Sequence, residues 1–224
     1  MRFEQLWPTP VAFGHIPVNE QLRQDVSQKA VEFNANRHEA IERAKQTNDL
    51  VRFKRRNLLD MDIESVNNFT EVAIDYFRDY LRNAVGDERA YQLDLEVRGV
   101  AKSYEYGTRI LPHYDAECDF VFLYYLTDSH GDDTRKTKEH LGESGLVLVD
   151  PRGYRTVASP MQETIKYFRP NAGDFIIYPA YLMHETDPNL TNGGRQLLAL
   201  SFNLKNPNPV PKKVFEGVRF GSDE

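Results

Sequence analysis

Asp119-Phe-Val-Phe-Leu-Tyr-Tyr-Leu-Thr127 is the stretch that decides the fold class. β-Branched and aromatic residues dominate it, and they favour strands because their side chains pack well on a pleated surface. Another strand is predicted before it, over residues 91–106, where apolar and polar side chains partly alternate. Four or five short strands are predicted after residue 143. The turn sequences that separate them contain Gly or Pro and lie at 150–153, 170–173 and 191–194.

Helical patterning precedes these strands. From Asn19 to about Gln46, apolar side chains stand at helical intervals, and Asn19 is expected to cap the first turn through its side-chain oxygen. A second helix is predicted over 66–81, where apolar residues recur every three or four positions. The stripe that they form, which includes Val72 and Tyr76, should pack flat against a sheet.

Helices first and many short strands afterwards predict an α+β fold. We expect a double-stranded β-helix, that is, a jelly-roll or cupin-like core, with N-terminal packing helices. The whole chain, residues 1–224, is predicted to form a single domain. Its helical part should span about 18–86 and its β-helix core about 91–204, with a C-terminal tail over 205–224.

Composition excludes several classes of partner. The formal net charge is -6 and the isoelectric point about 5.6, so a concentrated basic surface for nucleic acid or anionic membranes is not expected. No apolar run approaches the roughly 20 residues that cross a bilayer, and the first residues lack the apolar segment of a signal peptide. Cys118 is the only cysteine, which favours a reducing compartment. We therefore expect a cytoplasmic protein.

The first candidate site lies in Leu111-Pro-His-Tyr-Asp115. His113 and Asp115 stand two apart, and on an extended segment such side chains point to the same side. The imidazole and the carboxylate could therefore converge on one metal ion. A lone His-x-Asp occurs by chance in many sequences, so this pair alone leaves open a surface histidine after a turn.

A second histidine and an arginine extend this candidate site. His184 follows a turn, the hydrophobic run over 173–179 and a short bend. Eleven residues later, Arg195 opens another strongly apolar strand. A guanidinium group is costly to bury unless an anion meets it, so Arg195 predicts a bound anion such as a dicarboxylate cosubstrate. Taken singly, His184 also fits a hydrogen-bonded core histidine.

In this order, the motifs resemble those of the Fe(II)/2-oxoglutarate-dependent oxygenases, and most of all the prolyl-hydroxylase-like branch and its microbial relatives. The resemblance covers about residues 91–204. The matching segments are Tyr104-Glu-Tyr-Gly107, Pro112-His-Tyr-Asp115, Phe122-Leu-Tyr-Tyr-Leu-Thr127, Ser144-Gly-Leu-Val-Leu-Val-Asp-Pro-Arg152, Gly173-Asp-Phe-Ile-Ile-Tyr-Pro179, His184 and Arg195.

The resemblance implies a metal site. His113, Asp115 and His184 would form the facial triad of a non-heme Fe(II) centre, which leaves three coordination positions for 2-oxoglutarate and O₂. Related halogenases replace the ligand carboxylate with a small residue so that halide can bind the iron. Because Asp115 is present, halogenation is not expected.

The resemblance also implies contacts to the cosubstrate. Arg195 would hold the distal carboxylate of 2-oxoglutarate through a bidentate, charge-assisted contact. Tyr125 matches a tyrosine that hydrogen-bonds the same carboxylate, and Tyr104 matches one that lines the pocket; both also fit plain core packing. Many relatives carry Ser or Thr two residues after the arginine, where this chain has Leu197, and Ser201 lies too far along the strand to replace it.

Two further segments stay open. The charged stretch 128–143 is either a lid over the site or a disordered excursion. Glu117 and Asp119 continue the alternation of Asp115. If they face the cavity, they favour a cationic substrate such as an amine; otherwise they are solvated at a strand end.

The resemblance implies an oxidoreductase, a 2-oxoglutarate-dependent dioxygenase. We expect it to hydroxylate an aliphatic C–H of an amino-acid-like or peptidyl substrate, with release of succinate and CO₂. Whether the substrate is a free metabolite or a protein side chain, and whether oxidation ends in hydroxylation, desaturation or cyclisation, stays open. The N-terminal helices could provide a homodimer surface.

Two alternatives compete with this prediction. A cupin-type metalloenzyme would use a divalent ion as a Lewis acid without 2-oxoglutarate, which gives no reason for Arg195. A non-enzymatic jelly-roll module would bind a ligand and have no affinity for iron. Metal and 2-oxoglutarate titrations separate the three.

Overall fold

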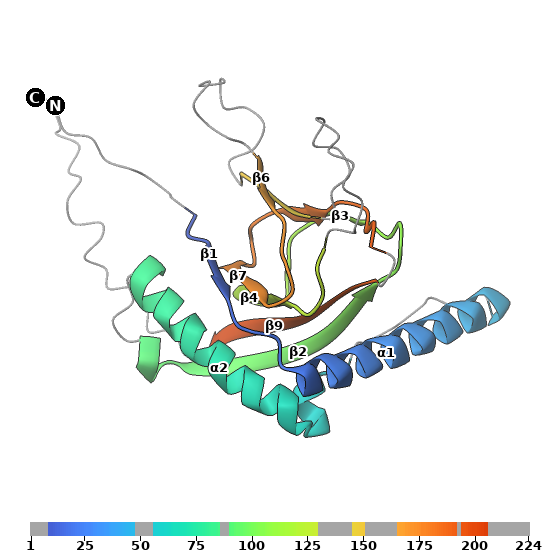
Figure 1. Ribbon diagram of the computed structural model, residues 1–224, viewed down its shortest axis with the longest axis horizontal. Coiled ribbons are helices and arrows are strands. Elements are labelled where there is room, and N and C mark those ends of the chain that lie inside the picture. Colours follow the sequence, from blue (N-terminus) through green and yellow to red (C-terminus); the bar gives the residue numbers. More distant parts are fainter. Residues whose placement is uncertain are drawn as a thin grey trace, which may run out of the picture.

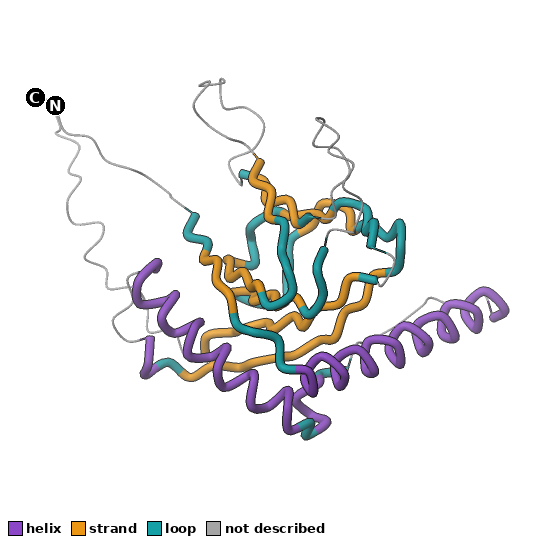
Figure 2. Tube along the Cα trace, in the orientation of Figure 1, coloured by secondary structure: helices purple, strands orange, loops and turns teal. Residues whose placement is uncertain are grey.

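The computed structural model describes residues 9–47, 56–85, 90–129, 145–150, 165–191 and 194–205. Two long helices lie on the outer side of a five-stranded sheet, and a smaller four-stranded sheet lies on its opposite side (Figures 1 and 2). Most of the charged stretch that could form a lid lies outside these residues, and so does nearly all of the predicted C-terminal tail. The single-domain boundaries stay a prediction.

The helices follow the predicted patterns. Helix α1 spans Glu20–Thr47, and the Asn19 side chain accepts a hydrogen bond from the Leu22 amide at 3.1 Å, as expected of a cap. Helix α2 spans Glu64–Tyr80. Three shorter elements complete the helical part: η1 (Leu58–Met61), the π-helical η2 (Leu81–Val85) and η3 (Ala90–Gln92).

The apolar stripe of α2 is narrower than predicted. Val72 and Tyr76 are about two-fifths exposed, although the Tyr76 ring still packs on Phe175 of the sheet with ring centroids 5.0 Å apart. Phe69, Ala73 and Phe77, in contrast, are buried. The spacing of apolar residues predicts which side of α2 faces the sheet. The sheet, however, buries fully only the residues along the centre of that side and leaves those at its margins partly exposed. No helix in the described part of the chain combines the length and apolar character needed to span a membrane. The homodimer surface stays a prediction.

In the part of the chain that the structure describes, nine strands build two antiparallel sheets. The five-stranded sheet has the order β1-β7-β4-β9-β2 and the four-stranded sheet the order β3-β8-β5-β6, which is the predicted double-stranded β-helix. The strands are β1 (Ala12–His15), β2 (Asp94–Tyr104), β3 (Ile110–His113), β4 (Phe120–Tyr125), β5 (Leu146–Val149), β6 (Ile165–Phe168), β7 (Asp174–Pro179), β8 (His184–Thr186) and β9 (Arg195–Lys205).

Two apolar clusters stabilise this arrangement. The larger one joins the helices to the outer face of the five-stranded sheet, where Phe77 stacks on Phe202 with ring centroids 4.2 Å apart. The smaller one fills the space between the two sheets and includes Leu123, Tyr178 and Leu197. Strands that contribute to both clusters, such as β4, are therefore buried on both faces. This double burial explains why residues 120–126 form an unbroken apolar run.

Candidate metal centre

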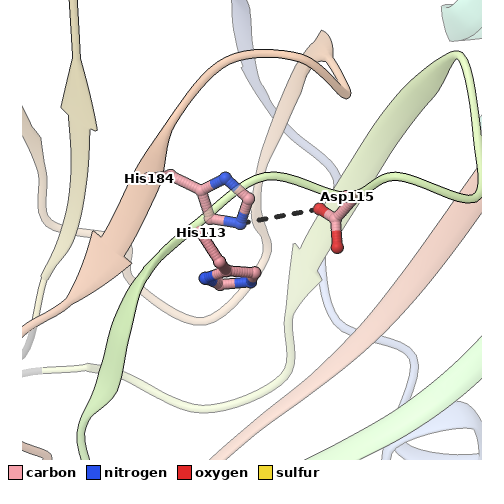
Figure 3. Close-up of side chains that lie close together, drawn as sticks. All are labelled: His113, Asp115 and His184. Atoms are coloured by element: carbon pink, nitrogen blue, oxygen red, sulfur yellow. Dashed lines mark ion pairs between the residues drawn. The ribbon is translucent and has the colours of Figure 1, made fainter.

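Three side chains converge where β3 ends and the neighbouring strand β8 begins. His113 ends β3, Asp115 follows it in an extended segment, and His184 begins β8 directly opposite His113. One ligand atom from each residue lies within 4.8 Å of the other two, and His184 Nε2 lies 3.5 Å from Asp115 Oδ2. Figure 3 shows the three side chains pointing toward one another. The two-residue spacing of His113 and Asp115 and the cross-strand pairing of His113 with His184 together create this cluster.

Backbone carbonyls orient both imidazoles. His113 Nδ1 lies 2.9 Å from the Leu111 carbonyl oxygen, and His184 Nδ1 lies 3.0 Å from that of Leu182. A carbonyl can only accept, so each Nδ1 must carry the hydrogen, and each Nε2 keeps its lone pair. Such partners fix the tautomer of metal-binding histidines.

Backbone hydrogen bonds fix the position of the segment that carries the Asp115 carboxylate. The Asp115 amide donates to the Ala180 carbonyl at 3.0 Å, and the Ala180 amide donates to the Asp119 carbonyl at 2.9 Å. These two bonds fasten the segment that carries Asp115 to the bend before His184. The distance between the carboxylate and the second histidine is therefore set by the backbone rather than by long flexible side chains.

Burial differs among the three residues. His184 is buried, whereas His113 and Asp115 are half-buried, so the cluster is open on one side. Burial lowers the pKa of His184 below its usual value, against smaller opposing effects of the Leu182 carbonyl and the Asp115 charge. The imidazole therefore stays neutral at physiological pH, which is the form that binds metal.

Tyr178 is a site residue that the sequence analysis gave no role. Its hydroxyl oxygen lies 3.3 Å from His184 Nε2, and its ring packs edge-on against that imidazole. Burial raises the pKa of Tyr178 well above its usual value, so the hydroxyl keeps its proton. The only signal in the sequence was its alternation with Ile176, because both belong to the cluster between the sheets.

The predicted cosubstrate residues gather around the start of β9. Gly194 adopts φ of +76°, where a side chain would strain the backbone, and Arg195 follows at the head of the strand. Arg195 is only 1% exposed, and its guanidinium carbon lies 5.0 Å above the ring centroid of Tyr104, its cross-strand neighbour. Burial also raises the pKa of Tyr125, and the charge of Arg195 acts on it in the opposite direction.

Leu197 and Ser201 share a face of β9 but have different neighbours. Leu197 lies in the apolar cluster between the sheets together with Tyr125, so it adds an apolar wall where many relatives have a hydroxyl. Ser201 lies four residues beyond Leu197 and pairs with Arg98 across the sheet. Four residues of strand span about 13 Å, so Ser201 does not belong to the surroundings of Arg195.

The acidic residues after Asp115 do not line the cavity as an alternating pair. A turn follows Asp115 at residues 116–117 and interrupts the alternation of sides. Asp119 Oδ2 accepts from the Leu204 amide at 2.8 Å, while the Glu117 side chain is 91% exposed and lies 3.8 Å from Arg98. They therefore give no support to a cationic substrate.

Comparisons with known proteins bear on the family and the fold of this chain. Residues 107–203 match the family described as "Putative 2OG-Fe(II) oxygenase". A crystal structure of a Pseudomonas putida prolyl-4-hydroxylase shares the fold, with a TM-score of 0.50, 13% identity, and coverage of 88% of this chain and 94% of that one. AviO1 from Streptomyces viridochromogenes matches with a TM-score of 0.49 and 12% identity over 91% of this chain and 92% of its own. No curated protein matches the chain.

The segment 107–203 thus belongs to the Fe(II)/2-oxoglutarate-dependent oxygenase superfamily, as the motif order predicted. The cofactors of this superfamily, Fe(II) and 2-oxoglutarate, are the ones predicted for this chain. Their requirements fit its residues: two histidines and a carboxylate are the donor set of non-heme Fe(II) oxygenases, and a buried arginine lies between two tyrosines on the same inner face.

Proposed function

We propose that the protein is a 2-oxoglutarate-dependent hydroxylase that acts on an aliphatic C–H of an amino-acid-like or peptidyl substrate. His113, Asp115 and His184 hold the Fe(II). The observation that carries the proposal is the convergence of these three groups, with both imidazoles oriented through Nδ1 so that each Nε2 lone pair is available. When bound, Fe(II) would let O₂ oxidise 2-oxoglutarate and the substrate together, so that one oxygen atom enters succinate, the other enters the hydroxylated substrate, and CO₂ is released.

Arg195, Tyr104 and Tyr125 hold the distal carboxylate of 2-oxoglutarate in this proposal. The guanidinium is buried and rigidly placed by the cross-strand pair with Tyr104, so it can meet a carboxylate with both of its N–H edges without first being ordered. Tyr125 keeps its proton because burial raises its pKa, so its hydroxyl can donate to the same carboxylate.

Apolar side chains around the centre exclude water. Leu123, Ile176, Leu197 and Ala199 line the inner face of the large sheet beside the site. Low polarity there strengthens the contact between Arg195 and an anion and keeps solvent away from the reacting carbon.

The two alternatives explain less of the site. A Lewis-acid cupin needs the metal ligands but gives no role to a buried arginine beside two tyrosines. A ligand-binding jelly roll accounts for neither the paired Nδ1–carbonyl contacts nor the His-Asp-His cluster.

The hydroxylation step is tested with isotopically labelled O₂. Purified protein with Fe(II), 2-oxoglutarate and a panel of N-acetyl amino acids and short peptides is analysed by mass spectrometry for products and succinate. A product that gains one labelled oxygen, in proportion to succinate, is the expected result. A product that loses two hydrogens without gaining oxygen would show desaturation or cyclisation instead, and the His184→Ala variant serves as the inactive control.

A further inference from the structure

The metal cluster lies beside an edge of the β-sandwich, because His113 ends the edge strand β3. Strand β2 is the edge of the five-stranded sheet, and β3 is the edge of the four-stranded sheet. Residues 105–109 join them directly, and this connection is fastened by the hydrogen bond from the Gly107 amide to the Asn189 carbonyl at 2.7 Å. Because β3 also carries His113, a substrate that enters between these edges passes along the inner face of β2.

That inner face carries a lysine. Lys102 lies opposite Leu197 in the β2–β9 register, and Tyr104 lies opposite Arg195. Residues directly opposite in an antiparallel pair share a face, and Leu197 belongs to the cluster between the two sheets, so Lys102 faces the same interior. Lys102 is half-buried, and no carboxylate of the described residues forms an ion pair with it.

Lys102 is a neighbour of the predicted cosubstrate residues. It lies two residues before Tyr104 on β2, so the two side chains point to the same face about 7 Å apart along the strand. Leu197, which lies opposite Lys102, also pairs with Tyr125 of β4. Lys102 therefore lies in the same row as Tyr125 and one row away from Arg195 and Tyr104.

The charges expected around the loaded metal indicate which kind of ligand Lys102 could bind. Two positive charges of Fe(II) and one of Arg195 offset the negative charge of Asp115 and the two of 2-oxoglutarate. The charges of these four groups cancel one another, so they leave no net negative charge for Lys102 to meet. A half-buried ammonium in such a site is stabilised by one further anion.

A cavity of about 200 Å³ opens at the same edge, and Lys102 and Tyr104 line it together with Ile110 of β3. From α1, Arg37 and His38 complete its wall, and Glu105 is its one carboxylate among the lining residues. Its wall consists of residues of α1, of β2, of the 105–109 connection and of the start of β3, and none of the three metal-cluster residues lines it. Its fixed positive charges outnumber its negative ones.

From these observations we propose that Lys102 binds a carboxylate of the substrate and places the rest of that substrate over the metal. The substrate class is therefore an amino-acid-like compound with a free carboxylate, rather than an amide within a peptide chain. This proposal rests on the proposed function and narrows its substrate.

Binding measurements without turnover test the proposal. Protein loaded with Mn(II) and 2-oxoglutarate, which does not turn over, is titrated by calorimetry with N-acetyl amino acids, each as the free carboxylate and as the carboxamide. The wild type should bind at least one carboxylate about tenfold more tightly than its carboxamide, as a charge-assisted contact requires. Lys102→Met should abolish that preference, while Lys102→Arg retains it.

Two controls separate the possible failures. Lys205→Met removes an exposed lysine at the far end of β9 and should change nothing. The affinity of Lys102→Met for 2-oxoglutarate should stay within about twofold of the wild type, and its melting temperature should show that it is folded.

Three results would overturn the assignment: equal binding of carboxylates and carboxamides, no binding by any carboxylate of the panel, or a preference that survives in Lys102→Met. A loss of 2-oxoglutarate affinity in Lys102→Met would assign the lysine to the cosubstrate and overturn the proposal as well. If the wild type itself fails to bind 2-oxoglutarate, the proposed function fails, and this substrate assignment fails with it.

Discussion

Replacing Arg195 with methionine should separate cosubstrate binding from stability. Arg195 is 1% exposed, so its guanidinium has given up nearly all of its hydration. A hydrogen bond to a charged group contributes about 1.5–3 kcal/mol, and a bidentate contact comprises two of them. The affinity for 2-oxoglutarate should therefore fall by roughly a hundredfold or more.

Stability should respond differently. Removing a buried cation removes its desolvation penalty but also its attraction for neighbouring groups such as the Asp187 carboxylate, and methionine has a similar length, so the melting temperature of the ligand-free protein should change little. Loss of the contact with the Tyr104 ring acts in the same direction as the lost attraction. Anaerobic titration of the Fe(II)-loaded protein gives the affinity, and differential scanning calorimetry gives the melting temperature.

A matched control is Arg43→Met, on the exposed face of α1, where the Arg43 side chain is 72% exposed. It should change neither quantity. An Arg195→Met variant whose 2-oxoglutarate affinity falls by less than about threefold would refute the role of Arg195.

Three further predictions concern other parts of the chain. Burial raises the pKa of the Asp187 carboxyl in the folded protein above its value in the unfolded chain. The ionised carboxylate therefore destabilises the fold once the pH exceeds the unfolded pKa, whereas the protonated form in acid does not. Asp187→Asn should therefore raise the melting temperature near neutral pH, and the gain should vanish in acid; a gain that persists in acid contradicts this cause. Tyr178→Phe removes a hydroxyl, 3.3 Å from His184 Nε2, that competes with a metal for the lone pair of this nitrogen, so iron affinity should stay the same or rise, and a fall in iron affinity on titration would contradict this reasoning. Phe77→Ala empties the stack on Phe202 and should lower the free energy of unfolding by about 3–5 kcal/mol in urea titrations, with iron affinity unchanged in the folded protein.

The sequence predicted the fold class because its strands are dense in β-branched and aromatic residues and its turns are marked by Gly and Pro. It predicted the metal cluster because the His-x-Asp spacing is local. The partnership of His113 with His184 is a cross-strand pair between distant segments, and only the family order of motifs suggested it.

Other residues were beyond sequence reasoning for physical reasons. Tyr178 lies in a strand that is buried on both faces, so polarity did not mark which side chains face the metal. The alternation that placed Glu117 and Asp119 beside Asp115 fails because a turn intervenes at 116–117. Val72 and Tyr76 lie at the margins of the α2 stripe, and the extent of a buried stripe depends on the shape of the sheet against it.

The central claim is that the His-Asp-His cluster and Arg195 together hold Fe(II) and 2-oxoglutarate. An anaerobic titration of the purified protein with both, followed through the weak visible charge-transfer band of iron-chelated 2-oxoglutarate, tests it most directly. The band should appear in the wild type, be absent in His184→Ala, and require far more 2-oxoglutarate in Arg195→Met. Iron binding without any band in the wild type would contradict the claim and favour a Lewis-acid metalloenzyme, and no iron binding at all would favour a non-enzymatic module.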